Sequence, residues 1–290
     1  MNFFKKFLPT PRNSRDTPQP DEQVALADFF DLLMRHSEAP PNEIETEVDP
    51  DTFTRLQARV ERTWSRLGKE DAHWSVITDN KFRKENIDNT LTDFFDMGEG
   101  DVKRLLAALH RAGAQLSRVR SVMDFGCGVG RLSVILSRHF DKVIGVDISP
   151  SHLREANSCF RSLGIENIQT RKLTSVSEIE TLEKCDLVYS IIVLQHNPPP
   201  VMRELLSRLC SRVERGGFLY VQIPTYKVGY SYSSDSDLLD NTDSMEMHIL
   251  PQKVVFDVIE KAGLSIREVV EDGAAWNLDF RSQAFLAQRK

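Results

Sequence analysis

A glycine-rich turn between a short strand and a helix constrains the fold of this chain more than any other feature. The segment SVMDFGCGVG, residues 121–130, indicates an apolar strand that ends in Asp124 and then turns through Gly126, Gly128 and Gly130. Glycines at alternate positions let the main chain pass close to a ligand and adopt positive φ. The free amide groups of the following helix favour an anion in the turn. The turn is therefore a predicted site for a carboxylate or phosphate.

An acidic residue ends the next predicted strand, KVIGVD, at residues 142–147. Asp147 follows Gly126 by 21 residues (147 − 126), a position from which a carboxylate accepts hydrogen bonds from both ribose hydroxyls. The turn and the acid together predict a site for an adenosine-containing cofactor. Tight packing of the turn without a ligand is the alternative interpretation, and Asp147 at this spacing makes it the less favoured one.

The glycine spacing separates two cofactor classes. Dinucleotide-binding proteins have the pattern G-x-G-x-x-G, but Arg131 stands at its third glycine position and Gly130 falls one place early. The pattern D-x-G-x-G-x-G instead resembles the glycine-rich motif of class I S-adenosylmethionine-dependent methyltransferases. This resemblance covers about residues 117–290.

The resemblance implies S-adenosyl-L-methionine as the cofactor and a role for each matching residue. In that family the glycine turn holds the methionine part, and the acid after the second strand holds the ribose. Asp124 would lie near the amino group and Ile148 against the adenine, while Thr174 stands near the place where many members bond the adenine with an acid. The implied cofactor-binding residues are Asp124, Gly126, Cys127, Gly128, Gly130, Asp147, Ile148, Thr174 and Ser190.

Alternation of strands and helices predicts an α/β fold with a seven-stranded, mostly parallel sheet and helices on both faces. The family resemblance adds that the last strand is antiparallel and lies between the fifth and sixth. The predicted strands are residues 121–125, 142–147, 168–173, 186–193, 218–223, 265–270 and 283–288.

Three segments are predicted in order along the chain. Residues 1–20, which contain four prolines, are expected to be a flexible tail, although the aromatic and basic residues 3–8 suit peripheral contact with an anionic membrane surface or a partner. Residues 21–115 are predicted to form a mostly helical cap, with helices at 21–36, 50–67 and 101–112. Residues 116–290 form the predicted S-adenosylmethionine-binding methyltransferase domain.

Two histidines are candidates for a general base. Gln195-His196 follows the fourth strand and resembles a step found there in many small-molecule methyltransferases, so His196 is the first candidate. An equally favoured interpretation is that His196 has only a structural role and holds the loop against the next helix. His248, beside Glu246, is the second candidate, and a solvated helix start is its alternative.

A long polar connection follows the fifth strand, at residues 224–248, and it is predicted to be a lid. It contains Tyr226, Tyr230 and Tyr232, which suit a polar ring-shaped substrate such as a sugar.

The composition excludes several other functions. A net charge of −6 argues against a nucleic-acid substrate, and four cysteines without a C-x-x-C pair indicate neither a zinc site nor a disulfide framework. No metal site is predicted, and the oligomeric state is left open. The sequence shows no apolar run of membrane-spanning length and no secretory signal, so a cytoplasmic location without an integral membrane segment is expected.

These features predict an enzyme that methylates a small polar acceptor, with an oxygen of a sugar or glycan-type metabolite as the first choice. Two alternatives remain open. One is a catalytically silent cofactor-binding subunit of a complex, and the other, less favoured, is a nicotinamide-dependent oxidoreductase.

Overall fold

The computed structural model describes residues 34–239, 244–275 and 279–290. The chain divides into two units, Met1–Asn42 and Glu43–Lys290. In the first unit the described residues begin with a helical segment that ends at Glu38. The predictions for the tail, its contact segment at residues 3–8 and most of the helix at 21–36 lie outside the described residues. All further description concerns the second unit.

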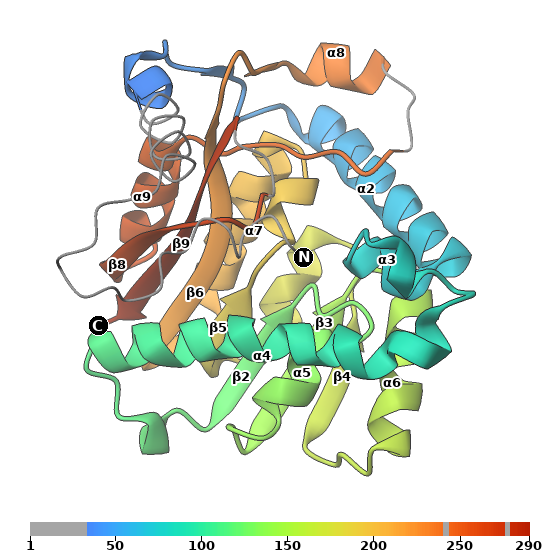
Figure 1. Ribbon diagram of the computed structural model, residues 1–290. Helices are drawn as coiled ribbons and strands as arrows, with labels where there is room; N and C mark the ends of the chain where they lie inside the picture. The colour runs from blue at the N-terminus through green and yellow to red at the C-terminus, as the bar shows by residue number, and fades with distance from the viewer. Residues whose placement is uncertain (1–33, 240–243, 276–278) are drawn as a thin grey trace, which may run out of the picture. The chain divides into compact units, whose positions relative to one another are not determined.

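A seven-stranded sheet forms the centre of this unit, with the strand order β4-β3-β2-β5-β6-β9-β8 (Figure 1). Every neighbouring pair is parallel except the two that involve β9, which runs antiparallel to β6 and β8. This order confirms the predicted sheet and the position of its last strand. The strands are β2 Ser121–Phe125, β3 Lys142–Asp147, β4 Ile168–Lys172, β5 Cys185–Ser190, β6 Val213–Lys227, β8 Leu264–Asp272 and β9 Phe280–Arg289.

Capping side chains mark the start of two of the longer helices. The Ser149 hydroxyl accepts a hydrogen bond from the His152 N–H, and Asp49 accepts from the N–H groups of Asp51 and Thr52. The helices are α2 Pro50–Glu70, α3 Ala72–Val76, α4 Ile87–Arg111, α5 Arg131–Leu136, α6 Pro150–Ser162, α7 Pro199–Ser211, α8 Ser234–Leu239 and α9 Gln252–Lys261.

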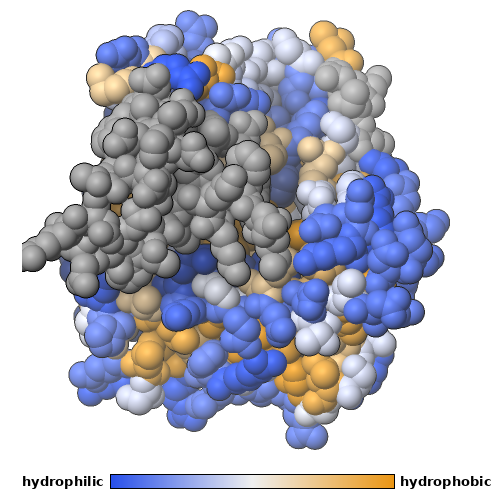
Figure 2. All heavy atoms as spheres, in the orientation of Figure 1, coloured by the Kyte–Doolittle hydropathy of each residue, from blue (hydrophilic) through white to orange (hydrophobic). Residues whose placement is uncertain are grey.

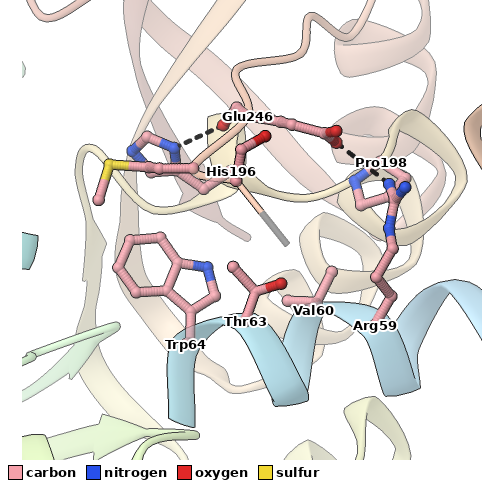
Figure 3. Close-up of a pocket in the computed structure, with 9 residues that line it drawn as sticks. Arg59, Val60, Thr63, Trp64, His196, Pro198 and Glu246 are labelled. Carbon is pink, nitrogen blue, oxygen red and sulfur yellow. Dashed lines mark hydrogen bonds and ion pairs between the residues drawn. The ribbon is translucent and has the colours of Figure 1, made fainter. Parts of the chain in front are cut away.

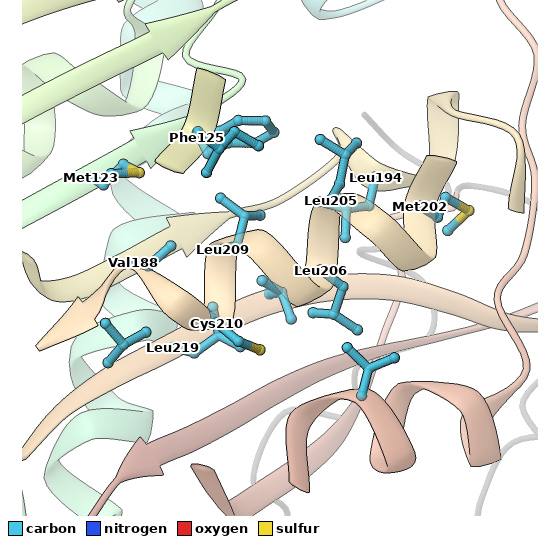
Figure 4. Packing of buried hydrophobic residues seen from close by; sticks show 14 of the residues in the cluster. Met123, Phe125, Val188, Leu194, Met202, Leu205, Leu206, Leu209, Cys210 and Leu219 are labelled. Carbon is cyan, nitrogen blue, oxygen red and sulfur yellow. The ribbon is translucent and has the colours of Figure 1, made fainter. Parts of the chain in front are cut away.

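Two hydrophobic clusters hold these helices on opposite faces of the sheet. Helices α4, α5 and α6 share one cluster with alternate residues of β2, β5 and β6, such as Val122 and Leu187. Helices α7 and α9 share the other cluster with the intervening residues, such as Met123 and Val188 (Figure 4). Each fully buried aliphatic side chain contributes about 1.5–3 kcal/mol. The layered α/β fold follows from this alternation.

Helix α4 is much longer than the sequence predicted. The expected helix began at residue 101, after an irregular segment, but α4 begins at Ile87 and runs through Gly98 and Gly100. A Cβ on Gly98 would lie 3.2 Å from the Arg131 carbonyl oxygen of α5, so this glycine permits close packing between the two helices. Packing here outweighs the low helix propensity of glycine, which made the prediction wrong.

The predicted lid is more regular than expected. Its first residues extend β6 to Lys227, and a short strand, β7 (Ser231–Tyr232), pairs in parallel with β1 (Glu43–Ile44). Helix α8 follows, and residues 244–250 return to the sheet as an extended segment. Strand pairing with a segment from the other end of the unit thus gives part of this connection regular structure, and its role as a lid stays a prediction.

Part of the molecular surface near the predicted cap is hydrophilic. Figure 2 shows hydrophilic residues gathered over α3 and the turn that follows it, a turn whose sequence contains both acidic and basic residues. Within the described part of the chain, no helix combines the length and the apolar character needed to cross a membrane. The division between cap and methyltransferase domain at residue 116 stays a prediction.

Candidate active site

The glycine turn joins β2 to α5 and has the predicted backbone geometry. Gly126, Gly128 and Gly130 have φ values of 77°, 54° and 85°, which side chains with a Cβ rarely adopt. A Cβ would also lie 2.3 Å from a methyl group of Val193 at Gly126, and 2.7 Å from one of Val76 at Gly128. The three positions therefore require glycine both for the backbone angle and for space.

Asp147 ends β3 directly beside this turn. Its side chain is about 10 % exposed, and its two carboxylate oxygens accept hydrogen bonds from the N–H groups of Gly128 and Ser149, both at 2.8 Å. Each carboxylate oxygen has two lone pairs, so each can accept one further hydrogen bond. The predicted turn and the predicted acid are thus hydrogen-bonded neighbours, and the acid keeps acceptor capacity for two hydroxyls.

Asp124 and Cys127 lie beneath the turn. Asp124 is 2 % exposed and accepts a 2.6 Å hydrogen bond from the Ser133 hydroxyl. Burial raises the pKa of this carboxyl to about 6, although the bond from Ser133 acts in the opposite direction. The Cys127 side chain packs against Gly145, and burial raises its thiol pKa well above the usual value. Its thiol is therefore protonated and unreactive at neutral pH.

Thr174 and Ser190 are engaged within the protein. Ser190 is fully buried and its hydroxyl donates to the Phe125 carbonyl at 2.9 Å. Thr174 is exposed just after β4, and both its N–H and its hydroxyl donate to the Glu178 carboxylate. These bonds lower the pKa of Glu178. The structure thus brings an acid to the place where the sequence had only a hydroxyl. Ile148, half-buried, follows Asp147 at the same edge of the sheet.

His196 lies in the loop after β5 and lines a small cavity. Its Nδ1 is 2.8 Å from the Glu246 carbonyl oxygen, and its ring meets the Trp64 ring edge-on at 5.3 Å between centroids (Figure 3). Burial lowers the pKa of His196 to about 4, so the imidazole is neutral at pH 7.

His248 lies close to His196, because Glu246 touches both histidines. The Glu246 backbone carbonyl holds His196, and its carboxylate lies 3.2 Å from Nε2 of His248. Nδ1 of His248 is 2.7 Å from the Tyr230 hydroxyl. Both ring nitrogens of His248 are thus engaged by neighbouring side chains, whereas Nε2 of His196 faces the Gln195 amide nitrogen at 3.3 Å, so His196 stays the first candidate for a base.

The cavity beside His196 has a volume of about 20 Å³, room for about one water molecule. One face of α2 supplies Arg59, Val60, Thr63 and Trp64 to its wall. The Trp64 ring also lies 6.3 Å from the ring of His152, whose Nδ1 is 3.8 Å from the Asp147 carboxylate. Trp64 therefore lies between His196, the candidate base, and His152, which neighbours Asp147. The sequence left Trp64 as either core or pocket lining and did not identify His152.

Arg59 joins the cap to the segment that follows β6. Its guanidinium is 2.6 Å from the Asp237 carboxylate and 3.1 Å from that of Glu246. Asp237, Glu246 and His248 each offer one potential metal-ligand atom, and these atoms lie within 4.8 Å of one another. Arg59 already supplies the positive charge at this cluster. Its role could not be predicted, because its partners lie almost 180 residues away.

Comparison with known proteins identifies the family. A family described as a methyltransferase domain matches residues 97–267. The ubiquinone biosynthesis O-methyltransferase of Methylobacterium sp. (strain 4-46) is 30 % identical over 100 residues, which is 34 % of this chain and 39 % of that protein. The human mitochondrial protein of that name is 27 % identical over 172 residues, covering 56 % of this chain and 45 % of its own. The matches thus span less than half the length of these two relatives.

Solved structures show the same fold. Magnesium protoporphyrin IX methyltransferase from Synechocystis PCC 6803, with bound S-adenosylhomocysteine, has a TM-score of 0.56 at 21 % identity and covers 81 % of this chain and 100 % of its own. Geranyl diphosphate C-methyltransferase from Streptomyces coelicolor A3(2) also has a TM-score of 0.56, at 16 % identity, and covers 81 % and 98 % respectively.

The family match, the sheet order and the glycine turn thus define a class I methyltransferase with S-adenosylmethionine as cofactor. The chain belongs to the methyltransferase domain family, and this membership overturns the nicotinamide alternative. The residues fit the cofactor, because the left-handed glycines border a carboxylate that retains acceptor capacity at both oxygens. The roles of the individual site residues stay predictions.

Proposed function

We propose that this protein methylates a hydroxyl oxygen of a small molecule, with His196 as the general base. S-adenosylmethionine supplies a methyl group on positively charged sulfur, which the acceptor oxygen attacks. The residues of the chain have to align the acceptor with that methyl group and remove the hydroxyl proton. The O-methyltransferase names of the relatives found among curated proteins support this reaction type.

The hydrogen bond between His196 and Glu246 carries the proposal. A backbone carbonyl oxygen only accepts hydrogen bonds, so Nδ1 of His196 must carry the ring proton. The ring is neutral at pH 7, so Nε2 holds a lone pair. Nε2 lies 3.3 Å from the Gln195 amide nitrogen, which is long for a hydrogen bond. A substrate hydroxyl can therefore replace this weak donor and pass its proton to Nε2.

The low basicity of His196 favours an acidic acceptor hydroxyl. A base with a pKa of about 4 and a phenol with a pKa of about 10 differ by about 8 kcal/mol for complete proton transfer. An aliphatic sugar hydroxyl is a weaker acid and raises this cost further. Proton transfer therefore has to accompany methyl transfer, and a phenol-type hydroxyl makes that step easier. Trp64 offers an aromatic surface beside His196 for such a ring, although the cavity of about 20 Å³ has to widen to admit it.

Two of the three tyrosines no longer favour a sugar or glycan acceptor. The Tyr232 hydroxyl donates to Asp237, and the Tyr230 hydroxyl is bonded to His248. These hydroxyls stabilise the segment after β6 instead of lining an acceptor site. We therefore propose a phenol-type acceptor first and keep a sugar hydroxyl as the second class in the test.

The test compares wild type with His196→Gln on phenol-type and sugar-type acceptors, with S-adenosylhomocysteine release as the readout. We expect a fall in kcat of about 10²–10⁴ for His196→Gln. The affinity for S-adenosylhomocysteine, measured by calorimetry, should stay within about twofold. His139→Gln is the matched control, because His139 is exposed. Full activity of His196→Gln would remove His196 from the mechanism. Tight S-adenosylhomocysteine binding without methylation of any acceptor would favour the silent-subunit alternative.

A further inference from the structure

A buried glutamine on β6 lies behind the candidate base. Gln222 is 2 % exposed, and its side-chain oxygen accepts a 2.7 Å hydrogen bond from the Ile192 N–H. Its amide nitrogen donates to the Gln195 side-chain oxygen at 3.0 Å and to the Ser282 hydroxyl at 2.7 Å. The Gln195 amide nitrogen in turn lies 3.3 Å from Nε2 of His196. One chain of hydrogen bonds thus connects the backbone of the loop after β5 to the imidazole.

The Ile192 N–H is the first donor in this series of hydrogen bonds, and it determines which atom donates in each of the others. A backbone N–H can only donate, so the Gln222 atom that faces Ile192 must be the oxygen. The Gln222 NH₂ group therefore faces Gln195, and the Gln195 oxygen accepts from it. The Gln195 NH₂ group is then left to face His196, so Nε2 of His196 must accept and cannot carry a proton.

Both sides of the imidazole independently require the same tautomer. The Glu246 carbonyl requires a proton on Nδ1, and the Gln222–Gln195 pair requires a lone pair on Nε2. The Glu246 backbone is itself placed by the neighbouring His248 N–H, which donates to the Gln195 carbonyl at 2.7 Å. Glu246 lies 50 residues after His196 in the sequence, whereas Gln195 directly precedes His196, yet both contacts require the same tautomer.

The same glutamine also holds an unfavourable backbone conformation. Ile192 has a φ of 59°, which is rare and sterically unfavourable for a β-branched residue. The bond from its N–H to Gln222 stabilises this bend, after which the loop turns towards Gln195 and His196. Such strain persists only where surrounding contacts over-determine it, and it is common at active sites.

We propose that Gln222 is a positioning residue that fixes the Nδ1–H tautomer and the orientation of His196 through Gln195, and that secures the bend at Ile192. The catalytic consequence rests on the proposed function, whereas the tautomer is a property of the protein alone. Gln222 touches neither the acceptor nor the cofactor in this role. It acts by keeping the Nε2 lone pair available.

The first test reads the tautomer directly in the wild-type protein. Long-range ¹H–¹⁵N correlation spectra of protein labelled at histidine distinguish the two neutral tautomers, and the His196→Gln variant assigns the His196 signals. We expect a protonated Nδ1 and an unprotonated Nε2 at pH 7. A protonated Nε2 in the neutral ring would overturn the proposal, whatever the enzyme activity.

The hydrogen bonds that run from Gln222 through Gln195 to His196 are here called the relay. The second test uses Gln222→Glu to reverse the donor and acceptor order in this relay. A carboxylate at this position still accepts from the Ile192 N–H, but it can only accept from Gln195, so the Gln195 amide has to rotate. The Gln195 oxygen then faces Nε2, which needs a proton while the Glu246 carbonyl still needs one on Nδ1. We expect the pKa of His196 to rise by at least about one unit in an NMR titration, and kcat to fall with little change in cofactor affinity.

Control variants separate this effect from general disturbance. Ser282→Ala removes the other partner of the Gln222 amide but leaves the Gln195 bond, so the tautomer and pKa of His196 should stay unchanged. Arg59, Glu246 and His248, the charged and titratable groups near His196, are unchanged in every variant, whereas Gln222→Glu adds a carboxylate whose own charge also raises the pKa of His196. An unchanged pKa of His196 in Gln222→Glu, or a changed tautomer in Ser282→Ala, contradicts the relay.

A neutral variant covers the case in which Gln222→Glu does not fold. Gln222→Met keeps a similar volume but offers no partner to the Ile192 N–H. The loss of about 1.4 kcal/mol should speed hydrogen exchange of that amide about tenfold. Unchanged exchange contradicts a role for Gln222 at the bend. The expected tautomer in a protein that methylates no hydroxyl would refute the proposed function but not the relay.

Discussion

The buried carboxyl of Asp124 allows the sharpest test of the electrostatics at this site. Its folded-state pKa is raised to about 6, compared with an ordinary value of 3.8. The folded protein therefore binds this proton more tightly than the unfolded chain does. The resulting stabilisation is fully present below pH 3.8 and is lost as the pH rises through about 6. The difference of about 2.2 units corresponds to about 3 kcal/mol in total.

Asp124→Asn removes this titration and retains an oxygen that accepts from the Ser133 hydroxyl. Between pH 5 and pH 7.5, wild type should lose about 1.4 kcal/mol of unfolding free energy relative to the variant. Urea unfolding followed by circular dichroism at both pH values measures this change. The difference in unfolding free energy between the two proteins cancels the contributions of the other titrating groups, including His196.

The predicted cofactor role of Asp124 adds an opposite effect. If the carboxylate receives the cofactor's amino group, Asp124→Asn should bind S-adenosylhomocysteine more weakly while being the more stable protein at pH 7.5. Such a trade-off is common at functional sites. A stability difference between the two proteins that does not change with pH would refute the argument, because it would mean that the Asp124 carboxyl titrates like an exposed one.

Two further predictions concern the turn and the ribose acid. Asp147→Asn should weaken S-adenosylhomocysteine binding by about 1–3 kcal/mol in calorimetry, because an amide cannot accept hydrogen bonds at both of its end atoms. The exposed control Asp141→Asn should bind S-adenosylhomocysteine normally. Equal affinities of the two variants would contradict the ribose role of Asp147. Gly128→Ala should lower the free energy of unfolding more than Gly113→Ala, because both glycines have positive φ but only a Cβ at residue 128 would meet Val76. Adding Val76→Ala to Gly128→Ala should remove the difference between the two glycine variants. An equal cost for the two glycine variants would contradict the contact.

Local sequence signals predicted the central part of the fold correctly. The glycine turn and Asp147 are short-range features, since backbone angles at glycine and the ends of buried strands follow from neighbouring residues. Alternation of strands and helices gave the sheet, and the family resemblance gave the antiparallel place of β9. His196 was found by its position after a strand, and its Nδ1–H tautomer was not.

Long-range contacts decided what the sequence could not show. The predicted helix began only at residue 101, yet packing of α4 on α5 at Gly98 accompanies a helix that begins at Ile87. The contact of the Glu178 carboxylate with the Thr174 N–H and hydroxyl was also not predicted, and an adenine contact at this place stays a prediction.

By itself the sequence determined the cofactor class and the layered α/β fold, because both depend on residue types at fixed short spacings. The tertiary structure alone decided how the imidazole of His196 is protonated and held. Its partners Glu246, Gln222 and Trp64 come from three separate segments, and no periodicity along the chain records that they meet. The base candidate is therefore visible in the sequence, while the physical basis of its reactivity lies in contacts between distant parts of the chain.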